Sequence, residues 1–383
     1  MSNQIMSTAE LQDGYNASIN ETEDYTSKLE VQIAFYFIYA SIFLLGICGN
    51  ALVCFVVARN KQMHTVTNLL ITNLALSDIL LCVLAVPFTP LYTFMGAWVF
   101  GSTLCCLVPY AQAVSVYIST FTLTSIAIDR FLVILYPFRP RMKIKACTIV
   151  IVGIWIVAGL LSLPYGLFRQ MDRNETFCEE NFPSESFRRA YSTITTILQF
   201  IVPFLLITVC YIFVSFRLNS RSRMRPGCNT SRREEADRER KRRTNRMLIS
   251  MVAIFGISWL PLNIINVVED FYSKANDWLP FKSCFFLAHF IAMSSTCYNP
   301  FLYAWLNENF RKEFKQVLPC FSRGTSDGTS RNTECGRSER MYNGNDTVQE
   351  SLLPVPTLKQ NNSSCEMISL EPINNEASKD QKN

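Results

Sequence analysis

Seven long apolar stretches, separated by short polar segments, dominate the chain. Each is too long and too unbroken for the core helix of a soluble protein, and each reaches the roughly 20 apolar residues that a helix needs to cross a bilayer. The pattern therefore predicts an all-α membrane protein, a bundle of seven transmembrane helices. The predicted spans cover residues 33–58, 69–94, 104–135, 146–168, 191–216, 247–270 and 283–306.

Polar segments flank this bundle of residues 33–306. Residues 1–32 are polar and acidic and lack the early apolar core of a secretory signal, so the first span must act as its own insertion signal. Residues 307–320 carry Phe310, Phe314, Val317 and Leu318 at helical spacing, which predicts a short amphipathic helix on the inner membrane surface. Residues 321–383 are rich in Ser, Thr, Asn and Gly, which predicts a disordered cytoplasmic tail.

The distribution of charge predicts the orientation in the membrane. Lys and Arg crowd the loops after the first, third and fifth spans, as in Arg59, Lys61 and Arg139, whereas acids such as Asp24 and Glu179 lie on the opposite side. Cytoplasmic loops carry the excess of Lys and Arg, so the N-terminus is extracellular and the C-terminus cytoplasmic. The net charge of +5 then indicates a basic cytoplasmic collar on a multi-pass plasma-membrane protein, and not a nucleic-acid-binding protein.

Modification signals agree with this orientation. Asn16, Asn20 and Asn174 each begin an Asn-X-Ser/Thr sequon on the extracellular side, which predicts N-glycosylation there. Cys320 follows the amphipathic helix at a position where a palmitate can anchor it. Most of the 14 cysteines fall inside spans, and only two histidines exist. Because no cysteines have zinc-type spacing, a metal site of that kind is not expected.

Polar side chains inside the spans are costly in a bilayer and therefore candidates for function. Asp78 lies midway along the second span, and oxygen atoms from Ser119 and Ser295 can join it in holding a sodium ion. A hydrogen-bonded packing network explains the same residues equally well.

Asp129 and Arg130 end the third span, where the arginine can pair with its neighbour or with a partner protein. Proline residues kink the fifth, sixth and seventh spans.

One motif in each span resembles the signatures of rhodopsin-like receptors, in the same order along residues 33–320. The motifs are Asn50 in Gly-Asn-Ala-Leu-Val, Leu-Ala-Leu-Ser-Asp78, Asp129-Arg130-Phe131, Trp155, Pro203, Trp259-Leu-Pro261 and Asn299-Pro-Phe-Leu-Tyr303. The resemblance implies a disulfide between Cys105 and Cys178. It also implies a set of activation-switch residues: Asp78, Asp129, Arg130, Tyr211, Phe255, Trp259, Pro261, Asn299, Pro300 and Tyr303.

The sequence departs from the family pattern at two places. Phe131 stands where the family usually has Tyr, which removes a hydroxyl group. The sixth span begins with Lys241-Arg-Arg-Thr, where some family members place an acid that faces the switch arginine. We therefore expect Asp129 to be the resting partner of Arg130.

A narrower resemblance links the chain to receptors for neuropeptide Y and neuropeptide F. It rests on Phe-Thr-Pro-Leu-Tyr-Thr-Phe-Met-Gly-Ala-Trp from residue 88, Leu-Val-Pro-Tyr-Ala-Gln ending at residue 112, Ser-Thr-Phe-Thr-Leu-Thr from residue 119 and Ala-Trp-Leu-Asn from residue 304. In that family a peptide with an amidated C-terminus enters the bundle tail first. The implied pocket residues are Thr89, Gln112, Gln199, Asn266, Asp270 and His289.

The sequence thus predicts a receptor without catalytic chemistry or cofactor. It would couple an amidated neuropeptide outside to a heterotrimeric G protein inside, of the inhibitory class, with arrestin and receptor kinases as further partners. A receptor for another RF-amide, RY-amide or tachykinin-like peptide is the alternative. A membrane transporter is the distant one, and the lack of internal repeats argues against it. Each polar pocket residue can also be a packing group, and Asp270 can merely cap a helix end.

Overall fold

The computed structural model describes residues 28–173, 176–223, 232–272 and 279–318. Twelve named elements in these ranges are helical and two are strands. The helices are α2 (Leu29–Arg59), η2 (Lys61–Met63), α3 (Val66–Leu84), α4 (Phe88–Met95), α5 (Gly101–Leu135), α6 (Ile144–Leu167), α7 (Glu185–Thr196), the π-helical η3 (Ile197–Ile201), α8 (Val202–Arg223), α9 (Arg232–Phe271), α10 (Leu279–Leu306) and α11 (Glu308–Val317). The strands are β1 (Arg169–Met171) and β2 (Cys178–Glu180).

These helices confirm the predicted all-helical membrane bundle. In the described part of the chain, six helical segments are long and apolar enough to cross a membrane. The seventh crossing is α10, which has 28 residues but carries the buried polar run Ser294, Ser295 and Thr296. Polar side chains are tolerated at membrane depth when they face the bundle interior, so this run lowers the hydropathy of α10 without excluding it as a span.

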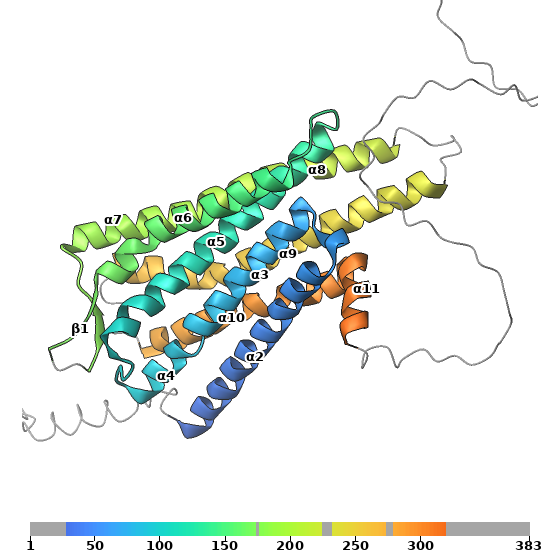
Figure 1. Ribbon diagram of the computed structural model, residues 1–383. Coiled ribbons are helices and arrows are strands. Elements are labelled where there is room, and N and C mark those ends of the chain that lie inside the picture. Colours follow the sequence, from blue (N-terminus) through green and yellow to red (C-terminus); the bar gives the residue numbers. More distant parts are fainter. Residues whose placement is uncertain (1–27, 174–175, 224–231, 273–278, 319–383) are drawn as a thin grey trace, which may run out of the picture. The chain divides into compact units, whose positions relative to one another are not determined.

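The long helix α5 runs through the middle of the bundle and packs against α3, α6 and α8, while α9 packs against α10 and α2 against α3 and α10 (Figure 1). The cytoplasmic half of the bundle contains a continuous apolar core that includes Val53, Leu74, Ile126, Met251 and Tyr303. In the outer half, a second cluster around Trp259 leaves room for a cavity.

Two predicted spans are broken into shorter helices. The second is a single stretch in the sequence, but α3 ends at Leu84 and α4 begins at Phe88. Pro87 lies in the break, and its missing N–H removes a helical hydrogen bond. The amide of Val86 instead reaches back to the carbonyl of Leu81. The fifth span is extended outward by α7 and contains the π-helical turn η3 just before Pro203.

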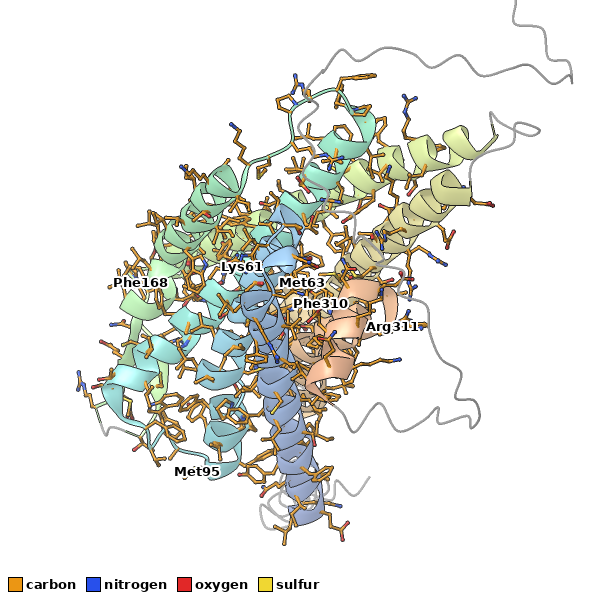
Figure 2. All side chains as sticks on the ribbon, turned by 45° about the vertical axis from the view of Figure 1, so that its right-hand side comes forward. Lys61, Met63, Met95, Phe168, Phe310 and Arg311 are labelled. Atoms are coloured by element: carbon orange, nitrogen blue, oxygen red, sulfur yellow. A yellow bond between two sulfur atoms is a disulfide. The ribbon has the colours of Figure 1, made fainter. Side chains whose placement is uncertain are left out.

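The predicted amphipathic helix after the last span is present as α11. Asn307 caps it by accepting hydrogen bonds from the amides of Asn309 and Phe310. Phe310 and Phe314 are buried, and the Phe310 ring stacks on Tyr303 with 5.2 Å between ring centroids. Figure 2 labels Phe310 and its neighbour Arg311 on this helix. The helix ends at Val317, so Leu318 follows it instead of completing its apolar face.

Several predicted features lie outside the described residues. They are the sequons at Asn16, Asn20 and Asn174, the palmitoylation site at Cys320 and the cytoplasmic tail of residues 321–383.

Candidate ligand-binding site

A cavity of about 850 Å³ opens among the outer halves of the helices. All six pocket residues named from the sequence line it, and they come from five different elements. Thr89 belongs to α4, Gln112 to α5, Gln199 to η3, Asn266 and Asp270 to α9, and His289 to α10. The fold therefore brings residues up to 200 positions apart together around one cavity. Local sequence patterns alone do not predict that these residues meet.

The outer wall of the cavity is fixed by a disulfide between Cys105 and Cys178, as the resemblance to rhodopsin-like receptors implied. It joins the first turn of α5 to strand β2, whose partner strand β1 continues directly from α6. The hairpin places Glu179 and Glu180 on the cavity wall. The disulfide thereby holds two carboxylates at the extracellular mouth.

The floor of the cavity is apolar except for a few amide and imidazole groups. Trp259, Val116 and Leu262 form its base, and the Trp259 indole N–H donates to Ser295 Oγ at 3.2 Å. In the part of the chain that the structure describes, the side-chain amides of Gln112 and Asn266 have no hydrogen-bond partner. Each amide offers both a donor and an acceptor, so together they suit a neutral polar group such as a peptide amide.

Two other expected pocket residues already have partners. His289 Nδ1 shares a hydrogen bond of 2.7 Å with the Tyr39 hydroxyl, which ties α10 to α2. Gln199 Nε2 donates to the Ala113 carbonyl at 3.4 Å, at the edge of hydrogen-bonding distance. Both side chains still line the cavity, so they shape it while also bracing the helices.

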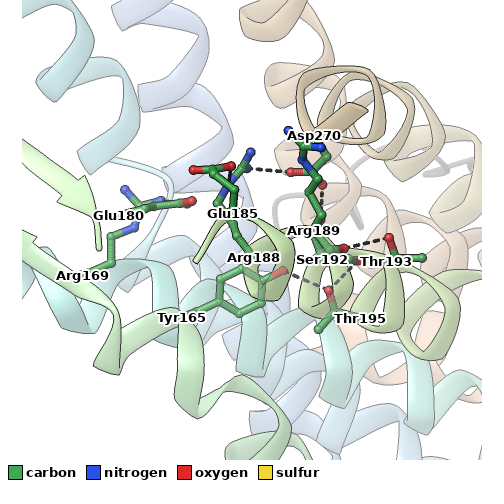
Figure 3. Close-up of polar contacts among 10 residues, drawn as sticks. All are labelled: Tyr165, Arg169, Glu180, Glu185, Arg188, Arg189, Ser192, Thr193, Thr195 and Asp270. Carbon is green, nitrogen blue, oxygen red and sulfur yellow. Dashed lines mark hydrogen bonds and ion pairs between the residues drawn. The ribbon is translucent and has the colours of Figure 1, made fainter. Parts of the chain in front are cut away.

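Asp270 is the most firmly engaged of the six, and Figure 3 shows its surroundings. Its Oδ1 accepts a hydrogen bond of 2.7 Å from Arg188 Nη1, and its Oδ2 accepts one from the hydroxyl of Ser192. Arg188 also contacts Glu185 at 3.1 Å. The side chain of Asp270 is 8% exposed and that of Arg188 23%. Asp270 is thus part of a shielded ion pair between α7 and α9, and does not simply cap a solvated helix end.

The sequence interpretation missed Arg188 and Ser192. They lie four positions apart, so they share one helical face, but the fifth span was predicted to start only at residue 191. The outward extension α7 begins at Glu185, capped by the Ser184 hydroxyl. A Ser followed by Glu is a helix-start signal in the sequence. It predicts that the helix begins here, but not that Arg188 faces Asp270.

Of the residues predicted to form the activation switch, Trp259 lies at the base of the cavity and the others lie outside its lining. Asn299 Nδ2 donates to Asp78 Oδ2 at 2.9 Å, and Asn50 donates to the carbonyls of Gly46 and Thr296. The Phe255 and Trp259 rings lie 6.0 Å apart next to Pro261, the proline inside α9. These contacts link α2, α3, α9 and α10 in one polar and aromatic layer, and Pro300 lies inside α10.

Two oxygens expected around a sodium ion near Asp78 are engaged elsewhere. Ser119 Oγ shares a hydrogen bond of 2.8 Å with Ser77, and Ser295 accepts from Trp259. A hydroxyl oxygen has two lone pairs, so each can still accept a second contact. The donor set fits the packing network and a small hard cation equally well.

At the cytoplasmic end, Arg130 makes the contact expected from its neighbour in sequence. Its Nη2 lies 2.5 Å from Asp129 Oδ2, and the same nitrogen donates to Thr67. Tyr211 and Tyr303 are buried nearby, and among the described residues their hydroxyls have no hydrogen-bond partner. The inner end of α9 is tied elsewhere, because Arg243 reaches Glu308 at 2.6 Å and the Trp305 carbonyl at 2.7 Å.

Comparison with known proteins connects this geometry to a family. A family model described as "7 transmembrane receptor (rhodopsin family)" matches residues 49–303. The chain is 37% identical over 314 residues to the neuropeptide Y receptor type 2 of Homo sapiens, covering 79% of this chain and 81% of that protein. The receptors of the same name from Mus musculus and Gallus gallus are also 37% identical over 314 residues, covering 81% and 80% of those proteins.

Proposed function

The chain belongs to the rhodopsin family of seven-transmembrane receptors, and we propose that it is a receptor for an amidated neuropeptide of the neuropeptide Y/F type. As a family member it is a non-enzymatic, multi-pass receptor of the plasma membrane. The relatives at 37% identity are neuropeptide Y receptors by name, which supports the proposed ligand class. The more specific proposal, a peptide with an amidated C-terminus and a neighbouring arginine, rests on the chemistry of the cavity.

The observation that carries the proposal is that neutral side-chain amides lie deep in the cavity and carboxylates lie at its mouth. Gln112 and Asn266 face the cavity without partners among the described residues. A free peptide carboxylate would need a cation at this depth, whereas an amidated C-terminus needs only neutral donors and acceptors. The cavity floor therefore suits a peptide that ends in an amide.

The mouth of the cavity suits a cationic residue next to that amide. Glu179, Glu180, Glu269 and Asp270 line it, against the two arginines Arg169 and Arg188. The acids outnumber the arginines, and a cleft with an excess of one sign of charge raises the local concentration of oppositely charged ligands. Asp270 can take a guanidinium in the bidentate geometry that Lys cannot copy. We therefore propose a ligand with Arg directly before an amidated aromatic residue.

On the cytoplasmic side we propose coupling to a heterotrimeric G protein of the inhibitory class, with arrestin and receptor kinases acting on the active state. Binding in the cavity would favour the bundle packing in which Arg130 leaves Asp129 and faces the partner protein. The kinks at Pro203, Pro261 and Pro300 give the fifth, sixth and seventh spans two alternative packings to switch between.

A panel of peptides on cells that express the chain tests the proposal. The panel contains peptides ending in Arg-Tyr-amide, Arg-Phe-amide and a tachykinin-like Met-amide, each also made with a free carboxylate. We expect lowered cAMP at nanomolar concentrations of an amidated arginine peptide, and at least about a hundredfold loss with its free acid, since a buried charge would be left unpaired. A response to the tachykinin-like peptide alone, or equal responses to amide and acid, would contradict the proposal.

A further inference from the structure

We propose that Arg188 is an internal competitor for the ligand, occupying the carboxylate of Asp270 until the arginine of the peptide displaces it. The inference deepens the proposed function and rests on it. Arg188 Nη1 lies 2.7 Å from Asp270 Oδ1, where the guanidinium of a bound peptide would have to lie. Both residues line the same cavity. Arg188 would thus decide which ligands can form an ion pair with Asp270.

Helix electrostatics explain why Arg188 and Asp270 form this pair. Asp270 lies one residue before the end of α9, where the helix dipole disfavours a negative charge. Arg188 is the fourth residue of α7, at a helix N-terminus, where the dipole disfavours a positive charge. Each charge therefore stands at the less favourable end of its own helix, and the contact between them offsets both effects. The pair also ties the outer end of α9 to α7.

The two oxygens of Asp270 are both in use in this arrangement. Arg188 takes Oδ1 and Ser192 takes Oδ2 (Figure 3). A peptide arginine that binds in bidentate fashion needs both oxygens. It must therefore replace Arg188, because two guanidinium groups would repel each other beside one carboxylate that is only 8% exposed.

Arg188 has a partner to fall back on once it is displaced. Glu185 Oε2 already lies 3.1 Å from Arg188 Nε, one helical turn earlier on α7. The displaced arginine can keep that contact and turn toward solvent, since it is already partly exposed. Displacement therefore exchanges one ion pair for another and does not leave a buried charge alone. It would also release the tie between α7 and α9.

This exchange predicts a specific signature for Arg188→Gln. Without the internal competitor, Asp270 is open to the ligand, so an Arg-Tyr-amide or Arg-Phe-amide peptide should bind about three to ten times more tightly, as expected for loss of a partly exposed ion pair. A matched peptide with citrulline in place of arginine, which has the same shape without the charge, should bind within about twofold of its wild-type affinity. Radioligand displacement on membranes measures both.

Arg189→Gln is the matched control. It removes the same charge from the neighbouring position of α7, and Arg189 is exposed and forms no ion pair within the described residues. It changes the overall electrostatic field at the cavity mouth and leaves the ion pair between Asp270 and Arg188 intact. If the gain in affinity came from that field alone, Arg189→Gln would reproduce it. In an Asp270→Asn background, Arg188→Gln should lose its effect, because the competition acts only through this carboxylate.

A second measurement does not depend on a ligand. In the unliganded, detergent-solubilised receptor, Arg188→Gln and Asp270→Asn should each lower the melting temperature by about 2–4 °C, and the double variant should fall no further than the lower single variant. Additive effects would show that the two residues are not paired in the resting receptor and would overturn the inference.

The remaining outcomes are equally decisive. A loss of arginine-peptide affinity in Arg188→Gln, at normal surface expression of an N-terminally tagged receptor, would mean that Arg188 binds the ligand directly. An unchanged affinity would mean that the pair is not displaced. If no peptide of the panel bound either the wild type or Arg188→Gln, both the proposed function and the proposed competition would be wrong. Non-additive melting temperatures would still show that Arg188 and Asp270 are paired.

Discussion

The outer and inner ends of α9 are each held by an arginine–carboxylate pair, but the two pairs are built in opposite ways. At the outer end, α9 supplies the carboxylate of Asp270, which lies on a cavity wall and is 8% exposed. At the inner end, α9 supplies the arginine, Arg243, and its partner Glu308 on α11 is 43% exposed. The same interaction type therefore operates in two different surroundings.

The difference shows how one helix can be sensitive to a ligand at one end and free to move at the other. A shielded pair is little weakened by salt and responds strongly to a competing ion, whereas an exposed pair is screened and contributes little. The inner contact is supplemented by a neutral hydrogen bond from Arg243 to the Trp305 carbonyl. We infer that ligand recognition is concentrated at Asp270 and that the inner end is held only weakly.

Replacing Asp270 should have the largest effect and would most directly test this contrast. In Asp270→Ala, an amidated arginine peptide loses a partly buried charge pair, so we expect its affinity to fall by about 2–5 kcal/mol, which is tens- to thousands-fold. A peptide whose arginine is already Ala should lose far less. Glu308→Ala, at the inner end, should leave both affinities within about twofold. Equal losses for the two peptides in Asp270→Ala would assign the acid to the receptor's own structure.

Replacing Arg130 should separate signalling from recognition. Its guanidinium rests on Asp129 and Thr67 and faces no part of the cavity. In Arg130→Ala we expect peptide affinity to stay within about twofold, while potency in a G-protein activation assay falls about tenfold or more, the range of typical coupling between sites. Full signalling by this variant would contradict the proposed switch.

Releasing the inner end of α9 should raise basal activity without a ligand. Arg243 ties α9 to α10 and α11, and an outward swing of α9 would break both of its contacts. We expect Arg243→Gln to increase ligand-independent G-protein activation about two- to fivefold, as loss of a partly exposed ion pair allows. Arg246→Gln is the control, because Arg246 is two-thirds exposed and pairs only within α9. Equal basal activity in the two variants would show that the inner tie does not hold α9.

The smallest effect is expected from Glu185, the second partner of Arg188. Glu185 is largely exposed and contacts Arg188 at the i,i+3 spacing. Without it, the displaced Arg188 loses its alternative partner, so Glu185→Gln should lower the affinity of an arginine peptide by less than about twofold. An effect as large as that of Asp270→Ala in the same displacement assay would show that Glu185 itself binds the ligand.

Local patterns in the chain were enough to predict the architecture and its orientation. The apolar stretches, the distribution of Lys and Arg and the spacing of Phe310 and Phe314 depend only on nearby residues. The Asp129–Arg130 contact was also predictable, because the two residues are adjacent in the chain. The resemblance to rhodopsin-like receptors added the disulfide, and the narrower resemblance to neuropeptide Y and neuropeptide F receptors named the six residues that line the cavity. The break at Pro87 was missed, because the apolar pattern continues across it.

The contacts that join helix ends were decided by the tertiary structure alone. Arg188 and Asp270 are 82 positions apart, and Arg243 and Glu308 are 65 apart. Which charges meet depends on how far each helix extends and how it is rotated, and both are set by packing against all its neighbours at once. The resemblance in the sequence therefore predicted Asp270 as a pocket acid, whereas only the packing of α7 against α9 showed that Asp270 forms an ion pair with an arginine of the receptor itself.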